Sequence, residues 1–269
     1  GLAIVAVLYS AVKFLDLPHW LLPKFPAVLR RVLVAAGLAI GLVLITLILY
    51  KPFQDWYAQA YSEITLWWGD RTTLKDYFTH WGLFLVVIIS WLIHEAVDWM
   101  DKTPVSALNK LRPFRSLIIA AAVLMLVVVL FLTFQQKVKI AWLALTMAVL
   151  ALLLLFRPGQ PEPKRVVLFM IGSAAVLTLA VEVIVLVGDI NRMNTVFKFY
   201  LQSWTLLSLS AAAGLYWMLP HIEVKWKSGW RNLWTAIVGL LVVGALFYPL
   251  TAAPAKIRDR MSEKAPHTL

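Results

Sequence analysis

The sequence has no cysteine among its 269 residues, and only 14% of them are charged. The missing thiols exclude disulfide bridges, thiolate metal sites and thiol-dependent catalysis. The low charge separates the chain from soluble domains, in which about 25% of residues are charged. The sequence also contains no glycine-rich phosphate loop, no nucleophile elbow and no dinucleotide fingerprint, so the common motifs of soluble nucleotide-dependent enzymes and hydrolases are missing.

Apolar residues, by contrast, make up 61% of the sequence, and the mean hydropathy is +0.80. Uninterrupted apolar runs recur along the chain, and each approaches the roughly 20 residues that cross the hydrocarbon core of a bilayer. The interior of a soluble helical protein would not be large enough to bury them all. The composition therefore predicts an all-α fold, a polytopic bundle of transmembrane helices.

By the length rule we expect about eight spans. The predicted spans cover residues 1–15, 32–50, 82–98, 116–134, 140–156, 166–187, 195–219 and 232–251. The first is a truncated span, because the sequence starts at Gly1 inside an apolar run, and we expect the chain to be an internal piece of a longer protein. Residues 1–251 would then form the bundle, and residues 252–269 would begin an extracytoplasmic tail or domain.

The formal net charge is +11, and the basic residues cluster in short connectors at the ends of apolar runs. Four connectors share one side of the bundle and are predicted to be cytoplasmic by the positive-inside rule, namely residues 16–31, 99–115, 157–165 and 220–231. Because no aromatic–basic motif for nucleic acid is present, we expect membrane lipids rather than nucleic acid as partners. The sequence predicts a multi-pass protein of the cytoplasmic (plasma) membrane.

The spans differ in polarity. The fourth and fifth carry almost no polar groups, and we expect them to be peripheral and to face lipid. The third, sixth and seventh contain the ionisable residues, and we expect them to line the interior of the bundle, where charges within a membrane normally lie.

Aromatic and apolar residues recur at spacings of three and four in the longest connector, which is predicted to lie outside the membrane. They are Phe53, Trp56, Tyr57, Ala60, Tyr61, Ile64, Trp67 and Trp68. This period makes one apolar stripe on a helix. Pro52 suits the first turn of such a helix and Gly69 its end. We predict an amphipathic helix over residues 53–68 that lies flat at the membrane interface, and the alternative is that its stripe packs on neighbouring helices.

Five polar residues interrupt the apolar sequence between the sixth and seventh spans: Glu182, Asp189, Arg192, Asn194 and Lys198. Ionised groups near hydrocarbon cost several kcal/mol each unless they are paired or hydrated. If the sixth helix continues far enough, Glu182 and Asp189 share one of its faces. The short turn makes the two helix ends neighbours, so the five side chains should gather at the outer end of the bundle.

Such a group suits a phosphate that carries an apolar tail. Arginine offers a planar fork of donors to phosphate, lysine adds a point charge, and the start of the seventh helix contributes a positive dipole end. The two acids would orient a hydroxyl group, bind a divalent cation as cofactor, or pair with the bases. The alternative is an ion-pair network that only clamps two helices.

A further charged group follows the predicted interfacial helix on the outer side, and its members are Asp70, Arg71, Lys75 and Asp76. These residues could reach the same end of the bundle, and Arg71 is therefore a sixth candidate for substrate binding. The alternative is a solvated loop.

His94, Glu95 and Asp98 lie near the inner end of the third span. The string H-E-A-V-D does not make the zinc-protease motif, because that motif needs a second His where Asp98 stands. We predict a polar network near the cytosolic interface and no metal site.

Three segments resemble the signature of the uncharacterised YYY membrane protein family. They are E-V-I-V-L-V-G-D-I-N-R-M-N-T-V-F-K-F-Y-L-Q-S-W from Glu182 to Trp204, Y-F-T-H-W-G-L-F-L from Tyr77 to Leu85, and Y-P-L-T-A-A-P-A-K-I-R-D-R from Tyr248 to Arg260. The overall plan of that family is similar to that of the GT-C glycosyltransferases, multi-spanning enzymes that use polyprenyl-phosphate sugars. The five polar positions between residues 182 and 198 match the family pattern.

The resemblance implies a hexosyltransferase that binds a polyprenyl-phosphate-linked sugar at the extracytoplasmic face and transfers the sugar. It also implies a catalytic base upstream of Gly1, because GT-C enzymes usually carry a catalytic Asp in their first outer loop. Two alternatives stay open: a transporter or flippase for a lipid or an anion, and a non-catalytic scaffold subunit. The transporter is weakened because no continuous polar track joins the outer and inner charged groups in the sequence.

Overall fold

The structure is a computed structural model that describes residues 27–56, 63–187 and 192–260. Contacts divide the chain into two units, residues 1–62 and 63–269. In the first unit the described residues form one helix, α2 (Ala27–Trp56), in which Lys51 and Asp55 make an ion pair of 2.9 Å one turn apart.

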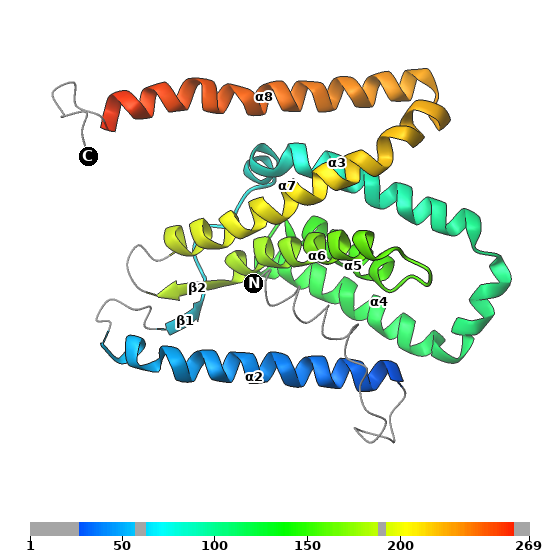
Figure 1. Cartoon of the computed structure of the whole chain (residues 1–269), viewed down its shortest axis with the longest axis horizontal. Coiled ribbons are helices and arrows are strands. Elements are labelled where there is room, and N and C mark those ends of the chain that lie inside the picture. Colours follow the sequence, from blue (N-terminus) through cyan, green and yellow to red (C-terminus); the bar gives the residue numbers. More distant parts are fainter. Residues whose placement is uncertain (1–26, 57–62, 188–191, 261–269) are drawn as a thin grey trace. The chain divides into compact units, whose positions relative to one another are not determined.

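The second unit is mostly helical and contains one small sheet (Figure 1). Its elements are β1 (Glu63–Leu66), α3 (Leu74–Lys102), the 3-10 helix η1 (Val105–Phe114), α4 (Arg115–Leu130), the π-helical turn η2 (Phe131–Gln135), α5 (Ala141–Leu155), α6 (Glu162–Val183), β2 (Ile184–Val187), α7 (Arg192–Lys225) and α8 (Ser228–Arg260).

Five of the described helical segments are long and apolar enough to cross a membrane. They are Ala36–Phe53, Leu74–Lys102, Arg112–Gln135, Glu162–Val183 and Ser228–Arg260. The predicted helical, multi-pass character is confirmed, whereas the predicted number of eight spans is not. The first predicted span lies outside the described residues, α5 has only 15 residues, and α7 is not among the five.

The predicted interfacial helix over residues 53–68 is wrong for the residues that are described. Residues 53–56 form the last turn of α2, and Pro52 lies inside that helix rather than at the start of another. Residues 57–62 lie outside the described residues, and Glu63–Leu66 is a strand. Its backbone pairs antiparallel with β2, with Glu63 opposite Val187 and Leu66 opposite Ile184. A strand ladder of this kind satisfies the backbone polar groups, and its β-branched residues favour it.

The predicted sixth span, residues 166–187, also ends earlier than expected. Helix α6 stops at Val183, and Ile184, the first residue of β2, has extended dihedrals of φ −119° and ψ 153°. The helical face proposed to join Glu182 to Asp189 therefore does not form. The β-branched run that follows Glu182 favours the strand, and β1 is available to pair with it.

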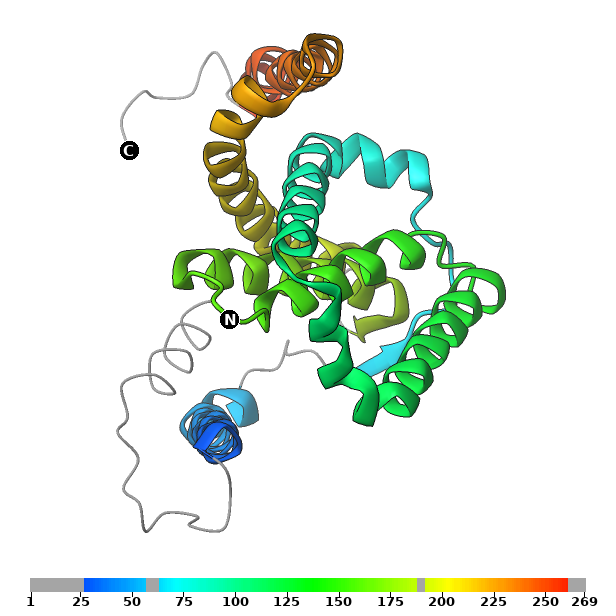
Figure 2. The same ribbon diagram turned by 90° about the vertical axis from the view of Figure 1, so that its right-hand side faces the viewer.

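The core of this unit is built by α3, α5, α6 and α7. Helix α6 packs against both α5 and α7, and α7 also packs along α3 (Figure 2). The contact between α3 and α7 is close because Gly214 faces the buried Trp91, and a Cβ atom at residue 214 would lie 3.2 Å from the indole. Helix α5 buries six residues, so the expectation that the fifth span faces lipid is wrong, whereas none of the side chains of α4 is buried.

Hydrogen bonds and ion pairs fix which connectors share an end of the bundle. At one end, Arg71 contacts both the carbonyl of Gln136 and the end of α6. At the other end, Arg157 and Lys164 contact Glu95 near the end of α3. The connectors around residues 99–115 and 157–165 therefore share one end, as the alternation of spans predicts. The assignment of that end to the cytoplasm stays a prediction.

Candidate functional site

The two-stranded sheet brings the start of α3, the end of α6 and the start of α7 together. After β1, the backbone N–H of Trp67 donates to the carbonyl of Val183 at 2.8 Å, which holds the segment that follows beside the end of α6. After β2, the chain returns into α7, and the backbone N–H of Leu186 donates to the hydroxyl of Thr195 at 3.0 Å. Residues 67–73 are thus neighbours of residues 182–187 and 192–195 despite the long sequence separation.

Glu182 lies at the centre of this region, and its side chain is fully buried. One carboxylate oxygen accepts hydrogen bonds from the Thr72 hydroxyl at 2.6 Å and from Arg192 Nη2 at 2.9 Å. The other oxygen accepts a hydrogen bond from the backbone N–H of Thr72 at 2.9 Å. These bonds satisfy a buried charge that would otherwise be expensive.

Arg71 adds a second guanidinium to the group. It donates to the main-chain carbonyl of Glu182 and, through Nε, to the carbonyl of Gln136 at 3.2 Å. Burial lowers the pKa of Arg71 from its usual value, the carboxylate of Glu182 opposes this shift, and the charge of Arg192 adds to it. Arginine nevertheless stays charged in proteins, so both guanidinium groups are cations.

Arg192 is held on two sides. Its guanidinium lies 5.0 Å from the centre of the Trp67 ring, a cation–π contact, and Nη2 pairs with Glu182. Among the described residues, Nη1 of Arg192 is buried without a hydrogen-bond partner. A buried charged donor in this state is costly, and an acceptor placed beside it would be favoured.

The resulting group, Arg71, Thr72, Glu182 and Arg192, has two cations and one anion. We name these four residues the Glu182 cluster. It fits an anion such as phosphate, which arginine forks bind well. It does not fit a divalent cation, because both oxygens of Glu182 already accept hydrogen bonds and two guanidinium groups lie close to it. Within the described part of the chain, no group of three His, Asp or Glu residues could hold a metal ion.

The structure gathers three of the six predicted site residues, Glu182, Arg192 and Arg71, in this cluster. The other two described candidates lie further along the first turns of α7, where Asn194 is half-buried and Lys198 is exposed. Asp189 lies outside the described residues. Sequence reasoning therefore found the charged members that converge, including one from a connector more than 100 residues away.

Sequence reasoning missed Thr72 and Trp67. A usable signal was present, because Thr73 caps α3: its hydroxyl accepts from the backbone N–H of Asp76 at 3.2 Å and donates to the Asp76 carboxylate at 2.7 Å. A threonine followed three residues later by an acid resembles the capping-box pattern, which marks the start of a helix and so fixes the position of Thr72. That Trp67 lies beneath Arg192 depends on the strand pairing, which no local pattern shows.

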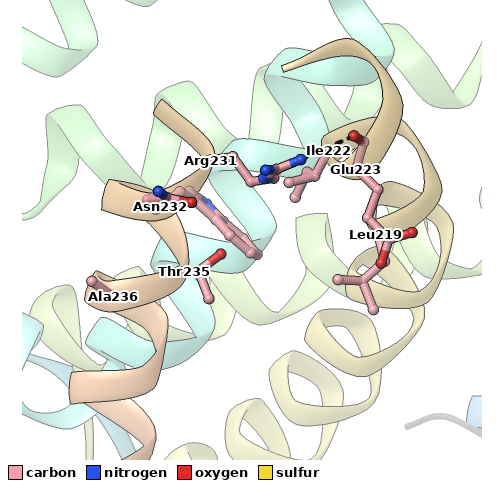
Figure 3. A pocket seen from close by; sticks show the side chains of 8 residues that line it. Leu219, Ile222, Glu223, Arg231, Asn232, Thr235 and Ala236 are labelled. Atoms are coloured by element: carbon pink, nitrogen blue, oxygen red, sulfur yellow. Dashed lines mark hydrogen bonds between the residues drawn. The ribbon is translucent and has the colours of Figure 1, made fainter. Parts of the chain in front are cut away.

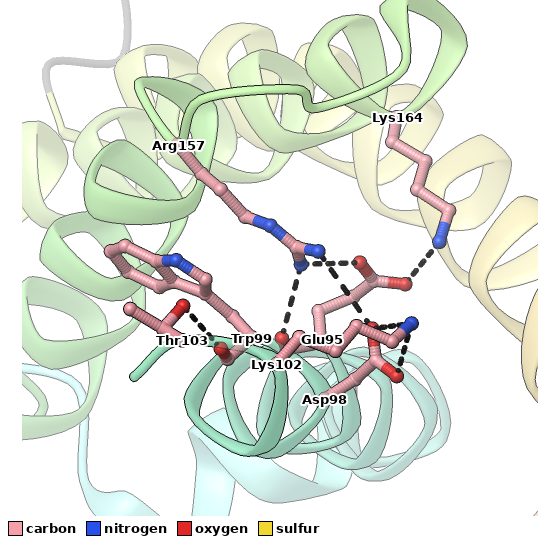
Figure 4. A network of polar contacts seen from close by, with 7 residues as sticks. All are labelled: Glu95, Asp98, Trp99, Lys102, Thr103, Arg157 and Lys164. Carbon is pink, nitrogen blue, oxygen red and sulfur yellow. Dashed lines mark hydrogen bonds and ion pairs between the residues drawn. The ribbon is translucent and has the colours of Figure 1, made fainter. Parts of the chain in front are cut away.

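A second polar group lies at the opposite end of α3 (Figure 4). Glu95 is buried and accepts from Lys164, and its other oxygen lies 3.6 Å from Arg157. Asp98 pairs with Lys102 at 2.8 Å and lies 3.7 Å from Arg157. This confirms the predicted polar network around Glu95 and Asp98. Its bases are Lys102 at the end of α3, Arg157 in the loop before α6 and Lys164 in the first turn of α6.

His94, predicted to belong to this network, lies against His221 of α7 with ring centres 4.6 Å apart. This pair joins α3 to α7 at the same end of the bundle.

Residues 1–207 match the family described as Uncharacterized membrane protein (DUF2298). The chain belongs to this family. The matched residues include the whole Glu182 cluster and the polar network around Glu95 and Asp98. The family assignment supports a membrane protein and does not address the resemblance to the YYY family or to GT-C enzymes, which stays a prediction. No curated protein and no solved structure matches the chain.

Proposed function

We propose that this chain is a GT-C type, glycosyltransferase-like membrane protein that binds the phosphate of a polyprenyl-phosphate-linked sugar at the extracytoplasmic face. The observation that supports the proposal most directly is the convergence of two guanidinium groups on one buried residue, Glu182. Arg192 pairs with its carboxylate, and Arg71 donates to its main-chain carbonyl. This leaves the cluster with an excess positive charge. The buried Nη1 of Arg192, which has no partner among the described residues, is a donor for a phosphate oxygen.

The surroundings of the cluster suit a phosphate on an apolar chain. The cluster lies where α6 ends and α7 begins, at the edge of the apolar helices, and the proposal puts it at the depth of a lipid phosphate. From this edge the side chains of Met193, Phe197 and Leu201 run down one face of α7 at spacings of four, and each is more than half exposed. Residues at this spacing share a helix face. This apolar stripe offers a surface for a polyprenyl tail.

The proposed chemistry is transfer of the sugar to a hydroxyl group. The acceptor oxygen forms a bond to C1 of the sugar and gives its proton to a base, while the bond between C1 and the phosphate oxygen breaks and the phosphate leaves with the electron pair. Arg192 and Arg71 would stabilise the negative charge that grows on the phosphate. Glu182 and Thr72 would hold Arg192 in position, and Asn194, Lys198 and Asp189 stay proposed contacts to the substrate. The base is expected upstream of Gly1.

The proposal is tested by sugar transfer from a polyprenyl-phosphate donor in membranes that contain the protein. Arg192→Ala and Lys198→Ala should abolish transfer, whereas Arg115→Ala, which removes an exposed arginine from a basic connector, should leave it unchanged. Activity is normalised to folded protein measured by gel filtration, because loss of Arg192 also costs stability. Full activity of both the Arg192 and the Lys198 variants would reject the role.

A second function, movement of a lipid or an anion, is favoured by one observation. The sequence shows no polar track between the two charged ends, but the structure places Ser203 and Ser210 fully buried on α7 between them. Uptake of the labelled polyprenyl-phosphate sugar into liposomes separates the two functions. Transfer without net transport supports the enzyme, and net movement without a new glycosidic bond supports the transporter.

A further inference from the structure

A cavity of about 650 Å³ lies between the last turns of α7 and the first turns of α8, away from the Glu182 cluster (Figure 3). Its polar lining comes from Glu223, Arg231, Asn232 and Thr235, and its apolar lining includes Leu219 and Trp234. Figure 3 shows Arg231 and Asn232 at one side of the opening and Leu219 on the facing helix. The cavity therefore has a charged part and an apolar part next to each other.

Helix α7 is long enough to reach from one headgroup layer of a bilayer to the other. Helix α7 has 34 residues, which corresponds to about 51 Å at 1.5 Å per residue. A bilayer with its headgroups is about 40–45 Å thick. When the Arg192 end of α7 lies at one surface, the cavity at the other end lies in the opposite headgroup layer. Trp226 and Trp234, which meet edge to face at 6.1 Å, fit that depth because tryptophan concentrates at membrane interfaces.

The cavity has a fixed wall and a basic rim. The indole N–H of Trp234 donates to the hydroxyl of Ser90 at 3.0 Å, which ties this wall to α3. Arg231 is half-buried and donates through Nη1 to the carbonyl of Glu223 at 3.3 Å, and within the described residues its side chain makes no other hydrogen bond. Lys225 and Lys227 are exposed at the end of α7 and in the adjoining turn, so this part of the chain has three cations and one carboxylate, Glu223.

We propose that this cavity binds an anionic glycerophospholipid of the surrounding membrane. Arg231 and Asn232 bind the phosphate, Lys225 and Lys227 add charge, and an acyl chain lies along Leu219 and Trp234. Basic pockets between transmembrane helices at the cytoplasmic side bind anionic headgroups in this way, and the basic connectors predict that side for this end of the bundle. The inference is independent of the proposed sugar transfer, because it uses no residue of the Glu182 cluster.

The test is native mass spectrometry of the purified protein with phosphatidylglycerol or phosphatidylcholine. The unaltered protein should retain phosphatidylglycerol in preference to phosphatidylcholine. Arg231→Gln should weaken that retention about tenfold, since a hydrogen bond to a charged group is worth a factor of this size or more. Ala236→Phe keeps every charge but fills the cavity, and it should weaken retention of both lipids. Arg112→Gln, a matched loss of one cation in another basic connector, should change neither.

Three results would overturn the inference. The first is retention of phosphatidylglycerol at the unaltered level in Ala236→Phe, a variant that remains informative if Arg231→Gln does not fold. The second is an equal loss in Arg231→Gln and Arg112→Gln, which would show a general effect of charge rather than a site. The third is displacement of the lipid by millimolar inorganic phosphate, which would show that only the anion is recognised.

Discussion

Removal of Arg192 should be among the most costly single changes at the Glu182 cluster. In Arg192→Met the side chain keeps its length and apolar stem but loses the guanidinium that pairs with Glu182 at 2.9 Å. The carboxylate then stays fully buried with only the two hydrogen bonds from Thr72. The perturbation therefore isolates the energy of a buried ion pair at the edge of a membrane bundle.

The expected cost follows from burial. Breaking a buried ion pair by removing one partner costs about 3–5 kcal/mol, because the remaining charge is uncompensated. Thr72 still donates to Glu182, and the side chain of Arg192 is 16% exposed, so we place the cost near the lower limit, about 3 kcal/mol. In the double variant Glu182→Gln/Arg192→Met neither charge remains, and the cost should fall to about 1 kcal/mol, the value of one ordinary hydrogen bond.

The assay measures the free energy of unfolding of the purified protein by titration with a denaturing detergent. It is applied to Glu182→Gln, to Arg192→Met and to the double variant. The double-mutant cycle should give a coupling energy of about 2 kcal/mol or more, within the range found for contacting residues. If the two single costs add to within about 0.5 kcal/mol, Glu182 and Arg192 are not coupled, and the account of the cluster given above is wrong.

Two further predictions concern the helices that position the site. Thr73→Ala should lower the free energy of unfolding by about 1 kcal/mol because it removes the N-cap of α3. The control is Thr79→Ala, which removes a hydroxyl that donates to the carbonyl of Lys75 in the same helix and should change the free energy of unfolding by less than about 0.5 kcal/mol. Equal effects of the two variants would contradict the capping role of Thr73. Gly214→Ala should lower the thermal unfolding temperature, because overpacking against Trp91 costs about 1–3 kcal/mol. The control is Gly239→Ala, where the added Cβ would meet no described atom within 4 Å, and it should leave the unfolding temperature unchanged or raise it. Equal stability of the two variants would show that α3 and α7 can separate at no cost.

Because burying a charge is costly, the sequence partly predicts which helices form the interior of the bundle. Ionisable residues in the third and sixth spans predicted that these helices line the core, and Glu95 and Glu182 are indeed buried there. The same reasoning failed for the fifth span. An apolar helix can face either lipid or protein, because hydrocarbon tails are as apolar as a protein core, and α5 packs on α6 through residues such as Met147 and Leu154.

The sequence predicted charged residues of the candidate site but not the backbone structure that brings them together. Glu182 and Arg192 were expected together, because a short turn brings the ends of the sixth and seventh spans close to each other. Arg71, from the longest connector, was a further candidate for the same end, with a solvated loop as the alternative. The two strands were not expected, since short apolar runs do not distinguish a helix from a strand by period alone. The pairing of Glu63 with Val187 joins residues more than 100 positions apart, and local propensity contains no information about it.

The uninterrupted length of α7 has a mechanical consequence. Helix α7 runs from Arg192 to Lys225 without a break, so the long segment before Pro220 can tilt only as one rigid body. Pro220 removes one backbone donor near the Lys225 end, so bending is concentrated there and the segment that begins at Arg192 moves as a unit. A tilt of that segment would change the distance between the guanidinium of Arg192 and the carboxylate of Glu182 on α6.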